Sequence, residues 1–299
     1  MRILEVGRRA GISKVGYGRE GRRLVASGHA QLVVWSLETF EQERVVPRAA
    51  PVTPLDCLFL PGGPAFLRAN GYWRAEDELP GAAALSDDHL RHSGHLTPLT
   101  GFRCFAADGK SVLRETYSQP WQSPQRLALW DFAGICVRGY PRAGSMGKSG
   151  AAFSPDGKIL ALDGAGITIA LLDAVTRELV TNLTHTDRVF GLTFSPDGKR
   201  LATSAGRTVR VWSVPEGECL YKFRAFRGYT ECRAFSPDGT LLVAGSREGR
   251  VRTWDVESGR ELSDHAWRQG AVSDVAFAPD GQTAAAACGE AVVVWDVDF

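Results

Sequence analysis

The string "FSPDG" occurs at residues 153–157, 194–198 and 235–239, so it returns every 41 residues. In Ser-Pro-Asp-Gly, proline presets φ at the second turn position and aspartate suits the third. Glycine then takes the left-handed conformation that closes the turn. Apolar residues flank the string on both sides, as in "LTFSPDGKRLATS" at 192–204. This pattern predicts a strand, a tight turn and a second strand.

Looser copies extend the repeat over the whole chain. They read "FAPDG" at 277–281, "FAADG" at 105–109, "FLPGG" at 59–63 and "YGREG" at 17–21. The closing glycines are Gly21, Gly63, Gly109, Gly157, Gly198, Gly239 and Gly281. Seven copies at this period predict a repeat architecture that forms one domain over residues 1–299.

A tryptophan follows most of the closing glycines at a nearly constant distance. It is Trp35, Trp212, Trp254 or Trp295, with Trp130 after an insertion in the third copy and Leu172 in its place in the fourth. The second copy has only Trp73, which comes too early, so this copy is the least regular. Runs such as "AVVVWDV" at 291–297 are apolar on both faces. Such strands are expected where a sheet is packed between two neighbouring sheets.

The turn and the tryptophan together resemble the WD-repeat (Trp-Asp repeat) β-propeller family, in a bacterial-type form. The stretches that carry the resemblance are "HTDRVFGLTFSPDGKRLATSAGRTVRVWSV" at 185–214 and "VRTWDVESGRELSDHA" at 251–266. The resemblance implies an all-β, seven-bladed propeller of four-stranded antiparallel blades. The chain stops at "VVVWDVDF", a third strand, and Arg2–Val6 has strand character. We therefore expect Arg2–Val6 to pair in the last blade and close the ring.

Blades of this family often hold a buried hydrogen-bonded set of a histidine, a turn aspartate, a serine or threonine, and the tryptophan. His185 and Trp212 match this set in blade five, but the turn there reads "SAGRT" and lacks the aspartate. We therefore expect an incomplete polar network, with packing and turn chemistry holding most blades.

Composition narrows the functional class. The chain has 35 Lys and Arg against 34 Asp and Glu, a balance that makes nucleic-acid binding unlikely. The first 23 residues carry seven basic against two acidic residues, which we interpret as a solvated edge rather than an anion-binding surface. No apolar run has the length of a signal peptide or a membrane span. The six cysteines form no C-x-x-C pair, and we expect a reduced, cytoplasmic protein.

Two stretches are similar to chemical sites but favour plainer interpretations. "RAGSMGKS" at 142–149 approaches a phosphate-binding loop, yet strand and turn follow it where that loop requires a helix. His89, His92 and His95 lie beside Asp87 and Asp88 and could bind zinc, but a polar surface loop is favoured. No nucleophile elbow is present. We therefore expect no catalytic, cofactor or metal site. A hydrolase- or lactonase-like enzyme, or a small-ligand binder using the central channel, is the alternative.

In the family, partners commonly dock on the face built from the loops between blades. The exposed positions lie four and six residues before the strand-ending aromatic and in the second-to-third strand turn. Carried onto this chain, they are Arg188, Phe190, Tyr229, Glu231 and Arg247, with Trp267 and Arg268 in the loop before blade seven. Tyr, Trp and Arg are common interface anchors. The resemblance thus implies a non-enzymatic scaffold that binds a protein or peptide mainly through blades five to seven.

Overall fold

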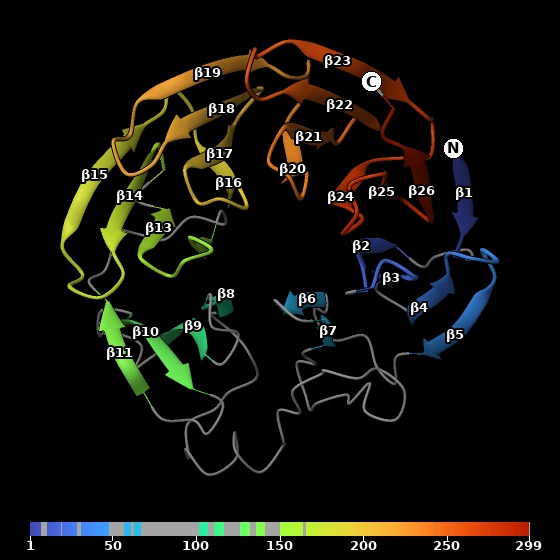
Figure 1. Cartoon of the computed structure of the whole chain (residues 1–299), viewed down its shortest axis with the longest axis horizontal. Helices are drawn as coiled ribbons and strands as arrows, with labels where there is room; N and C mark the ends of the chain where they lie inside the picture. Colours follow the sequence, from blue (N-terminus) through green and yellow to red (C-terminus); the bar gives the residue numbers. More distant parts are fainter. Residues whose placement is uncertain are drawn as a thin grey trace.

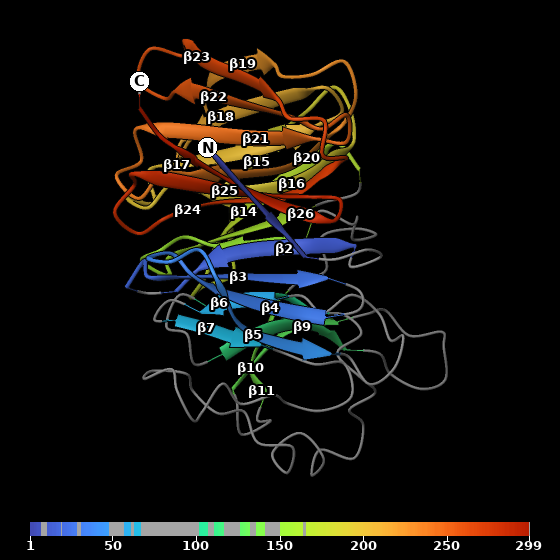
Figure 2. The same ribbon diagram turned by 90° about the vertical axis from the view of Figure 1, so that its right-hand side faces the viewer.

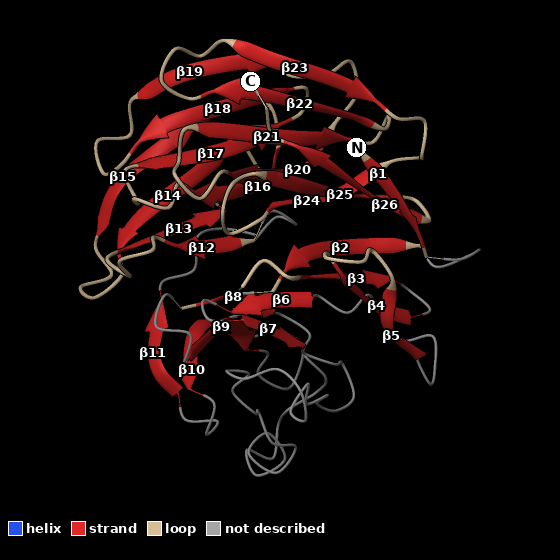
Figure 3. Cartoon of the chain, turned by 45° about the vertical axis from the view of Figure 1, so that its right-hand side comes forward, coloured by secondary structure: helices blue, strands red, loops and turns tan. Residues whose placement is uncertain are grey.

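The computed structural model describes residues 1–6, 11–18, 20–28, 31–47, 57–60, 63–66, 102–106, 111–116, 126–131, 136–140, 150–163 and 166–298. Every regular element in these ranges is a β-strand, as Figure 3 shows, which agrees with the all-β prediction. Within the same ranges no helix has the length and apolar character needed to cross a bilayer.

The described strands form six four-stranded antiparallel sheets and one two-stranded sheet, which we number one to seven in chain order. Sheet one contains β2 (Ile12–Tyr17), β3 (Arg23–Gly28), β4 (Gln31–Ser36) and β5 (Gln42–Pro47). Sheet two contains β6 (Cys57–Leu60) and β7 (Gly63–Phe66). Sheet three contains β8 (Phe102–Phe105), β9 (Ser111–Thr116), β10 (Arg126–Asp131) and β11 (Cys136–Tyr140).

The remaining four sheets each contain four strands. Sheet four contains β12 (Ala151–Phe153), β13 (Ile159–Asp163), β14 (Thr168–Asp173) and β15 (Leu179–Thr184). Sheet five contains β16 (Val189–Phe194), β17 (Arg200–Ala205), β18 (Thr208–Ser213) and β19 (Cys219–Arg224). Sheet six contains β20 (Thr230–Phe235), β21 (Leu241–Ser246), β22 (Arg250–Asp255) and β23 (Glu261–Ala266). Sheet seven contains β24 (Val272–Phe277), β25 (Thr283–Cys288), β26 (Ala291–Asp296) and β1 (Arg2–Glu5).

The sheets follow one another around a common centre, with the first strand of each sheet nearest to it (Figure 1). Contacts between first strands link sheet four to five, five to six, six to seven and seven to one. Figure 2 shows the strands running across the thickness of the molecule, from one loop-bearing side to the other. The order of the sheets in space therefore repeats their order in the chain.

The "FSPDG" strings form the tight turns that the sequence predicts. In the turn at 194–198, the Gly198 amide donates to the Ser195 carbonyl oxygen at 2.9 Å, and Gly198 has φ of 72°. The Ser195 hydroxyl donates to Asp197 Oδ1 at 2.6 Å and accepts the Arg200 amide at 2.9 Å. The turns at 153–157 and 235–239 repeat this geometry. The serine and aspartate thus fix the entry into the second strand, beyond what proline and glycine contribute.

The repeated turn also spaces neighbouring sheets, because four of the closing glycines face the turn proline of the preceding sheet. A Cβ on the glycine would lie 3.4 Å from the proline Cδ for Gly198 and Pro155, 3.7 Å for Gly239 and Pro196, 3.7 Å for Gly281 and Pro237, and 3.6 Å for Gly21 and Pro279. The last of these pairs joins sheet one to sheet seven. The recurring string therefore serves both the turn within a sheet and the contact between sheets.

The hydrophobic cores lie between sheets. One cluster joins sheets three and four, a second sheets four and five, a third sheets five and six, a fourth sheets six and seven, and a fifth sheets seven and one. Trp35, Trp212, Trp254 and Trp295 are all buried in these clusters. A sheet covered on both faces requires apolar residues on both, which explains why these strands do not alternate.

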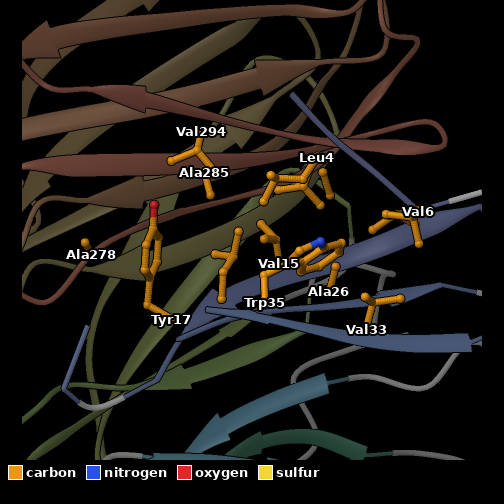
Figure 4. Packing of buried hydrophobic residues seen from close by; sticks show 14 residues of the cluster. Leu4, Val6, Val15, Tyr17, Ala26, Val33, Trp35, Ala278, Ala285 and Val294 are labelled. Carbon is orange, nitrogen blue, oxygen red and sulfur yellow. The ribbon is translucent and has the colours of Figure 1, made fainter. Parts of the chain in front are cut away.

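The first strand of the chain lies beside the last. β1 pairs antiparallel with β26, with Ile3 opposite Val293 and Leu4 opposite Val292. Leu4 is buried among Val15 and Trp35 of sheet one (Figure 4), whereas Ile3 faces outward and is exposed. The Met1 amino group also lies 3.5 Å from the Asp296 carboxylate. The pairing expected for Arg2–Val6 is present over Arg2–Glu5.

Candidate functional site

The loops between sheets and the turns between second and third strands lie on the same side of the molecule. We call this side the loop face, and its described part in sheets five to seven consists of segments 185–188, 206–207, 225–229, 247–249, 267–271 and 289–290. The "FSPDG" turns lie at the opposite ends of the strands. The loop face therefore carries side chains that the repeated turn does not engage.

Backbone hydrogen bonds join these segments to one another. The Thr230 amide donates to the Gly206 carbonyl oxygen at 3.2 Å, and the Arg247 amide donates to that of Tyr229 at 3.3 Å. The Gly289 amide donates to the Ala271 carbonyl oxygen, also at 3.2 Å. The turn of sheet five is thus hydrogen-bonded to the residue that follows the next loop. The turns of sheets six and seven are each bonded to the loop that precedes their own sheet. The first two bonds form a frame across sheets five and six, and a separate bond joins the two segments of sheet seven.

Close approaches at glycines tighten the frame. Asp187 lies against Gly206 so closely that there is no room there for a Cβ. A Cβ on Gly228 would lie 2.9 Å from Glu248 Oε1, and one on Gly249 would lie 2.6 Å from the Gly270 carbonyl oxygen. Asp187 also accepts the Arg188 amide at 2.7 Å. Two of the carboxylates on this face are therefore packed along its glycines.

The sequence-predicted docking residues occupy this frame. Phe190 and Glu231 fall at β-bulges in the first strands of sheets five and six. A bulge adds one residue without a partner in the neighbouring strand and turns its side chain out of the regular alternation. Arg188, Glu231 and Arg247 are exposed, and Phe190 is half-buried. The positions counted back from the strand-ending aromatic thus reach the loop face.

An aromatic pair spans sheets five and six on the loop face. The ring centroids of Phe190 and Tyr229 are 5.2 Å apart, and the ring planes meet at 62° in an edge-to-face arrangement. Tyr229 is 51% exposed, which is unusual for a large aromatic side chain. The pair forms an apolar platform that is open to solvent at Tyr229.

Trp267 and Arg268 have different surroundings. Trp267 stacks on His265, with centroids 5.5 Å apart, and packs against Trp295 of sheet seven at 4.9 Å. It is half-buried and joins the core between sheets six and seven. Arg268 is exposed, with a positive φ of 58°. Trp267 therefore covers the core, while Arg268 extends from the loop beside it.

Two arginines that the sequence positions did not single out lie on the same face. Arg207 follows Gly206 in the turn of sheet five, and Arg227 precedes Gly228 in the loop before sheet six. Both are exposed. The strings "SAGRT" and "AFRGY" contain the signal, because an arginine next to a glycine in a tight loop has few ways to be buried.

A buried polar network lies at the junction of sheets four and five. His185 Nε2 and Trp212 Nε1 both lie within hydrogen-bond distance of Thr203 Oγ1, at 2.8 and 2.9 Å. His185 Nδ1 lies 3.3 Å from the Ile167 carbonyl oxygen. Burial, followed by the nearby charge of Arg210, lowers the pKa of His185 to about 4. The network links His185 to sheet five. It does so without the turn aspartate, which the sequence lacks.

Charged residues on the first strands bridge neighbouring sheets. Lys14 Nζ lies 3.7 Å from Asp274 Oδ1, and the Val15 amide donates to Asp274 Oδ2 at 3.1 Å. Arg233 Nη1 donates to Ser204 Oγ at 2.6 Å, with its guanidinium over Gly191, where no Cβ would fit. Burial raises the pKa of Asp274 and lowers that of Arg233 to about 10. These contacts join sheet seven to one and sheet six to five.

Other sequence features fall outside the described residues. These are the histidines at 89, 92 and 95 and the stretch at 142–149. Within the ranges that the structure describes, no group of three or more His, Cys, Asp and Glu side chains could hold a metal ion. Cys104, Cys219, Cys232 and Cys288 are free cysteines. The loop face is therefore the candidate site that the described residues support best.

Comparisons with known proteins agree with this geometry. The WD40 family (WD domain, G-beta repeat) matches residues 177–213, 217–255 and 257–296. WD repeat and SOCS box-containing protein 1 of Xenopus tropicalis is 36% identical over 96 residues, which are 31% of this chain and 23% of that protein. The U3 small nucleolar RNA-associated protein 18 homolog of Mus musculus is 30% identical over 153 residues, which are 50% of this chain and 27% of that protein.

The chain spans only about a quarter of the length of these two relatives. The three family matches cover the outer strand of sheet four and all of sheets five and six. They continue through β24, β25 and β26 of sheet seven. They thus contain the loop-face segments from Arg188 to Glu290. Residues 177–213, 217–255 and 257–296 of this chain are repeats of the WD40 family.

Proposed function

We propose that this chain is a seven-bladed propeller, closed by β1, that acts as a non-enzymatic protein-interaction scaffold. WD-repeat proteins generally mediate protein interactions. In this chain the partner docks on the loop face of sheets five and six. The observation that carries the proposal is the contact of the half-buried Phe190 with the exposed Tyr229, held across two sheets on a hydrogen-bonded frame.

The platform has the properties of an interaction anchor. Aromatic side chains bury a large area on binding, and Tyr229 keeps a hydroxyl for a polar contact. Phe190 is half-buried, so its orientation is already fixed before a partner arrives. A surface that is ordered in advance loses less conformational entropy on association.

The arrangement of the sheets supports the seven-bladed frame. Sheets one and three to seven each have four strands in the described residues, and sheet two contributes two. β1 pairs with β26, and the Gly21–Pro279 contact repeats the contact between successive turns. A ring in which every sheet has two neighbours covers both faces of each sheet and leaves only short edge strands open.

The test compares partner capture by the wild-type chain and by an Arg188→Ala/Tyr229→Ala double variant, each used as bait in extract of the native cell. The matched control is Arg260→Ala/Tyr221→Ala, which removes the same side-chain types at the outer and opposite parts of sheets five and six. We expect the docking variant to lose specifically captured proteins and the control to retain them. Thermal unfolding of the docking variant should stay close to wild type. Equal capture by both variants would contradict the docking face.

A further inference from the structure

The loop face of sheets five to seven presents one exposed arginine in each of five successive segments. They alternate between loop and turn in chain order: Arg188, Arg207, Arg227, Arg247 and Arg268. None of the five forms an ion pair or a side-chain hydrogen bond with the residues that the structure describes. The five guanidinium groups therefore remain available to a partner.

Three other arginines on the same sheets, Arg200, Arg250 and Arg252, form ion pairs, whereas Arg224 and Arg260 are exposed without one in the described part of the chain. Arg250 Nη2 lies 2.6 Å from Asp264 Oδ2, and Arg252 contacts the same carboxylate at 2.9 Å. Arg200 lies 3.3 Å from Glu257 Oε2 near the "FSPDG" turns. An exposed guanidinium next to carboxylates of its own chain is partly neutralised by them. The five loop-face arginines form no such ion pair within the described residues, although Asp187 and Glu248 adjoin Arg188 and Arg247 in the chain, and their grouping on one side distinguishes this face.

We infer that the docking partner is an acidic protein segment, with an apolar side chain on the Phe190–Tyr229 platform and carboxylates reaching the flanking arginines. This rests on the proposed docking function and adds the chemistry of the partner. Arginine binds carboxylates bidentately through its planar fork of donors. The platform lies beside Arg207, Arg227 and Arg247 in the hydrogen-bonded segments of sheets five and six, so one extended segment can meet both.

The carboxylates on the loop face favour a protein over a nucleic acid. Asp187 and Glu248 lie in the same segments as Arg188 and Arg247, and Glu231 lies in β20, just after the segment that contains Arg227. Asp187 and Glu248 pack along Gly206 and Gly228, whereas Glu231 is exposed at its bulge. A phosphate backbone brings negative charge at every step and would meet these groups. A peptide can place its few carboxylates at the arginines alone.

The experiment selects a random-peptide phage library against the full-length chain and then measures the affinity of the enriched peptides for variants. We expect the enriched peptides to carry Asp or Glu beside a large apolar residue. Arg207→Glu and Arg247→Glu should each weaken binding about tenfold, because each replaces an attraction by a repulsion. Arg260→Glu, at the opposite end of sheet six, is the matched control and should leave the affinity unchanged.

The opposite charge change gives the sharpest outcome. Glu231→Lys should strengthen binding of the enriched peptides several-fold, and Glu216→Lys in the turn at the other end of sheet five should not. Binding should weaken when NaCl is raised from about 0.05 M to about 0.5 M. A Glu231→Lys variant that binds equally well or more weakly would overturn the acidic-partner inference.

The outcomes separate this inference from the docking proposal. Enriched peptides without acidic residues, whose binding still requires Tyr229, would contradict the acidic partner and leave the docking face standing. Peptides that bind the Tyr229→Ala variant equally well, or no enrichment at all, would contradict both. Labelled poly(U) RNA is the nucleic-acid probe. If the chain bound poly(U) tightly and Arg207→Glu abolished that binding, the inferred partner would be an RNA and the acidic-peptide inference would be overturned.

Discussion

The imidazole of His185 and the hydroxyl of Thr203 are joined by a 2.8 Å hydrogen bond at the junction of sheets four and five. His185 follows the outer strand of sheet four, and Thr203 lies in the second strand of sheet five. The Ile167 carbonyl oxygen can only accept, so His185 Nδ1 carries the proton and Nε2 accepts from Thr203. Protonation of Nε2 would remove that acceptor. The contact between two sheets therefore depends on a neutral histidine.

We expect the stability of the chain to fall as the pH is lowered from about 6.5 to about 4, by about 2–3 kcal/mol from this group. The pKa of His185 is lowered from 6.5 to about 4 in the folded chain. Between these values the unfolded chain binds a proton that the folded chain does not, so acid favours unfolding. Urea unfolding at a series of pH values measures the slope.

His185→Gln should flatten this slope, and His265→Gln is its control. His265 is half-buried beside Trp267, outside the Thr203 network. A wild-type chain whose stability is constant between pH 6.5 and pH 4.5, or a slope that survives in His185→Gln, would show that the histidine is not held neutral.

We expect Trp267→Ala to destabilise the chain by about 2–3 kcal/mol, as removal of a packed aromatic does. Its ring lies 4.9 Å from that of Trp295 within the core of sheets six and seven. Tyr229→Ala, which removes an exposed ring, should change stability by less than about 1 kcal/mol. Thermal or urea unfolding of both variants makes the comparison. If the Trp267→Ala variant were as stable as wild type, the core role of Trp267 would be contradicted and the docking role expected from the sequence would be favoured.

We expect Gly239→Ala to destabilise the chain by about 1–2 kcal/mol. Gly239 has φ of 75°, and its Cβ would lie 3.7 Å from Pro196 of the preceding turn, so strain rather than collision opposes alanine. Gly139 in β11 is the control, because nothing lies within 4 Å of its Cβ position. Gly139→Ala should be neutral or slightly stabilising when both variants are unfolded by urea. Equal stability of the two variants would contradict the turn argument.

The sequence predicted the turns because their chemistry is local. Proline, aspartate and glycine set one another's conformations within five residues, and the period of the string then gives the order of the sheets. The contact of Gly198 with Pro155 was not predictable in this way, because it joins two turns 41 residues apart. Its meaning appears only when neighbouring sheets are placed side by side.

In the candidate site, too, the local features could be predicted from the sequence and the contacts between sheets could not. Counting back from the strand-ending aromatic led to Phe190 and Tyr229, but their edge-to-face contact depends on how sheets five and six pack. Trp267 follows β23 as His185 follows β15, and in that position it fills the space beside the next sheet's tryptophan. No local pattern separates this use of tryptophan from an exposed anchor. Arg207 and Arg227 lie outside the counted positions, so they could be identified only once the structure had shown which segments form the loop face.

The pairing of β1 with β26 gives the last prediction, because neighbouring residues of β1 have opposite environments. Leu4 is 7% exposed and packs against sheet one, whereas Ile3 is 42% exposed on the other side of the strand. We expect Leu4→Ala to destabilise the chain by about 2–4 kcal/mol and Ile3→Ala by less than about 1 kcal/mol. Hydrogen exchange at the Val292 and Val294 amides should rise in Leu4→Ala, since β1 covers that strand. Equal effects of the two substitutions would mean that β1 adds an edge strand without joining the core, and the closure of the ring by the N-terminal strand would then have to be abandoned.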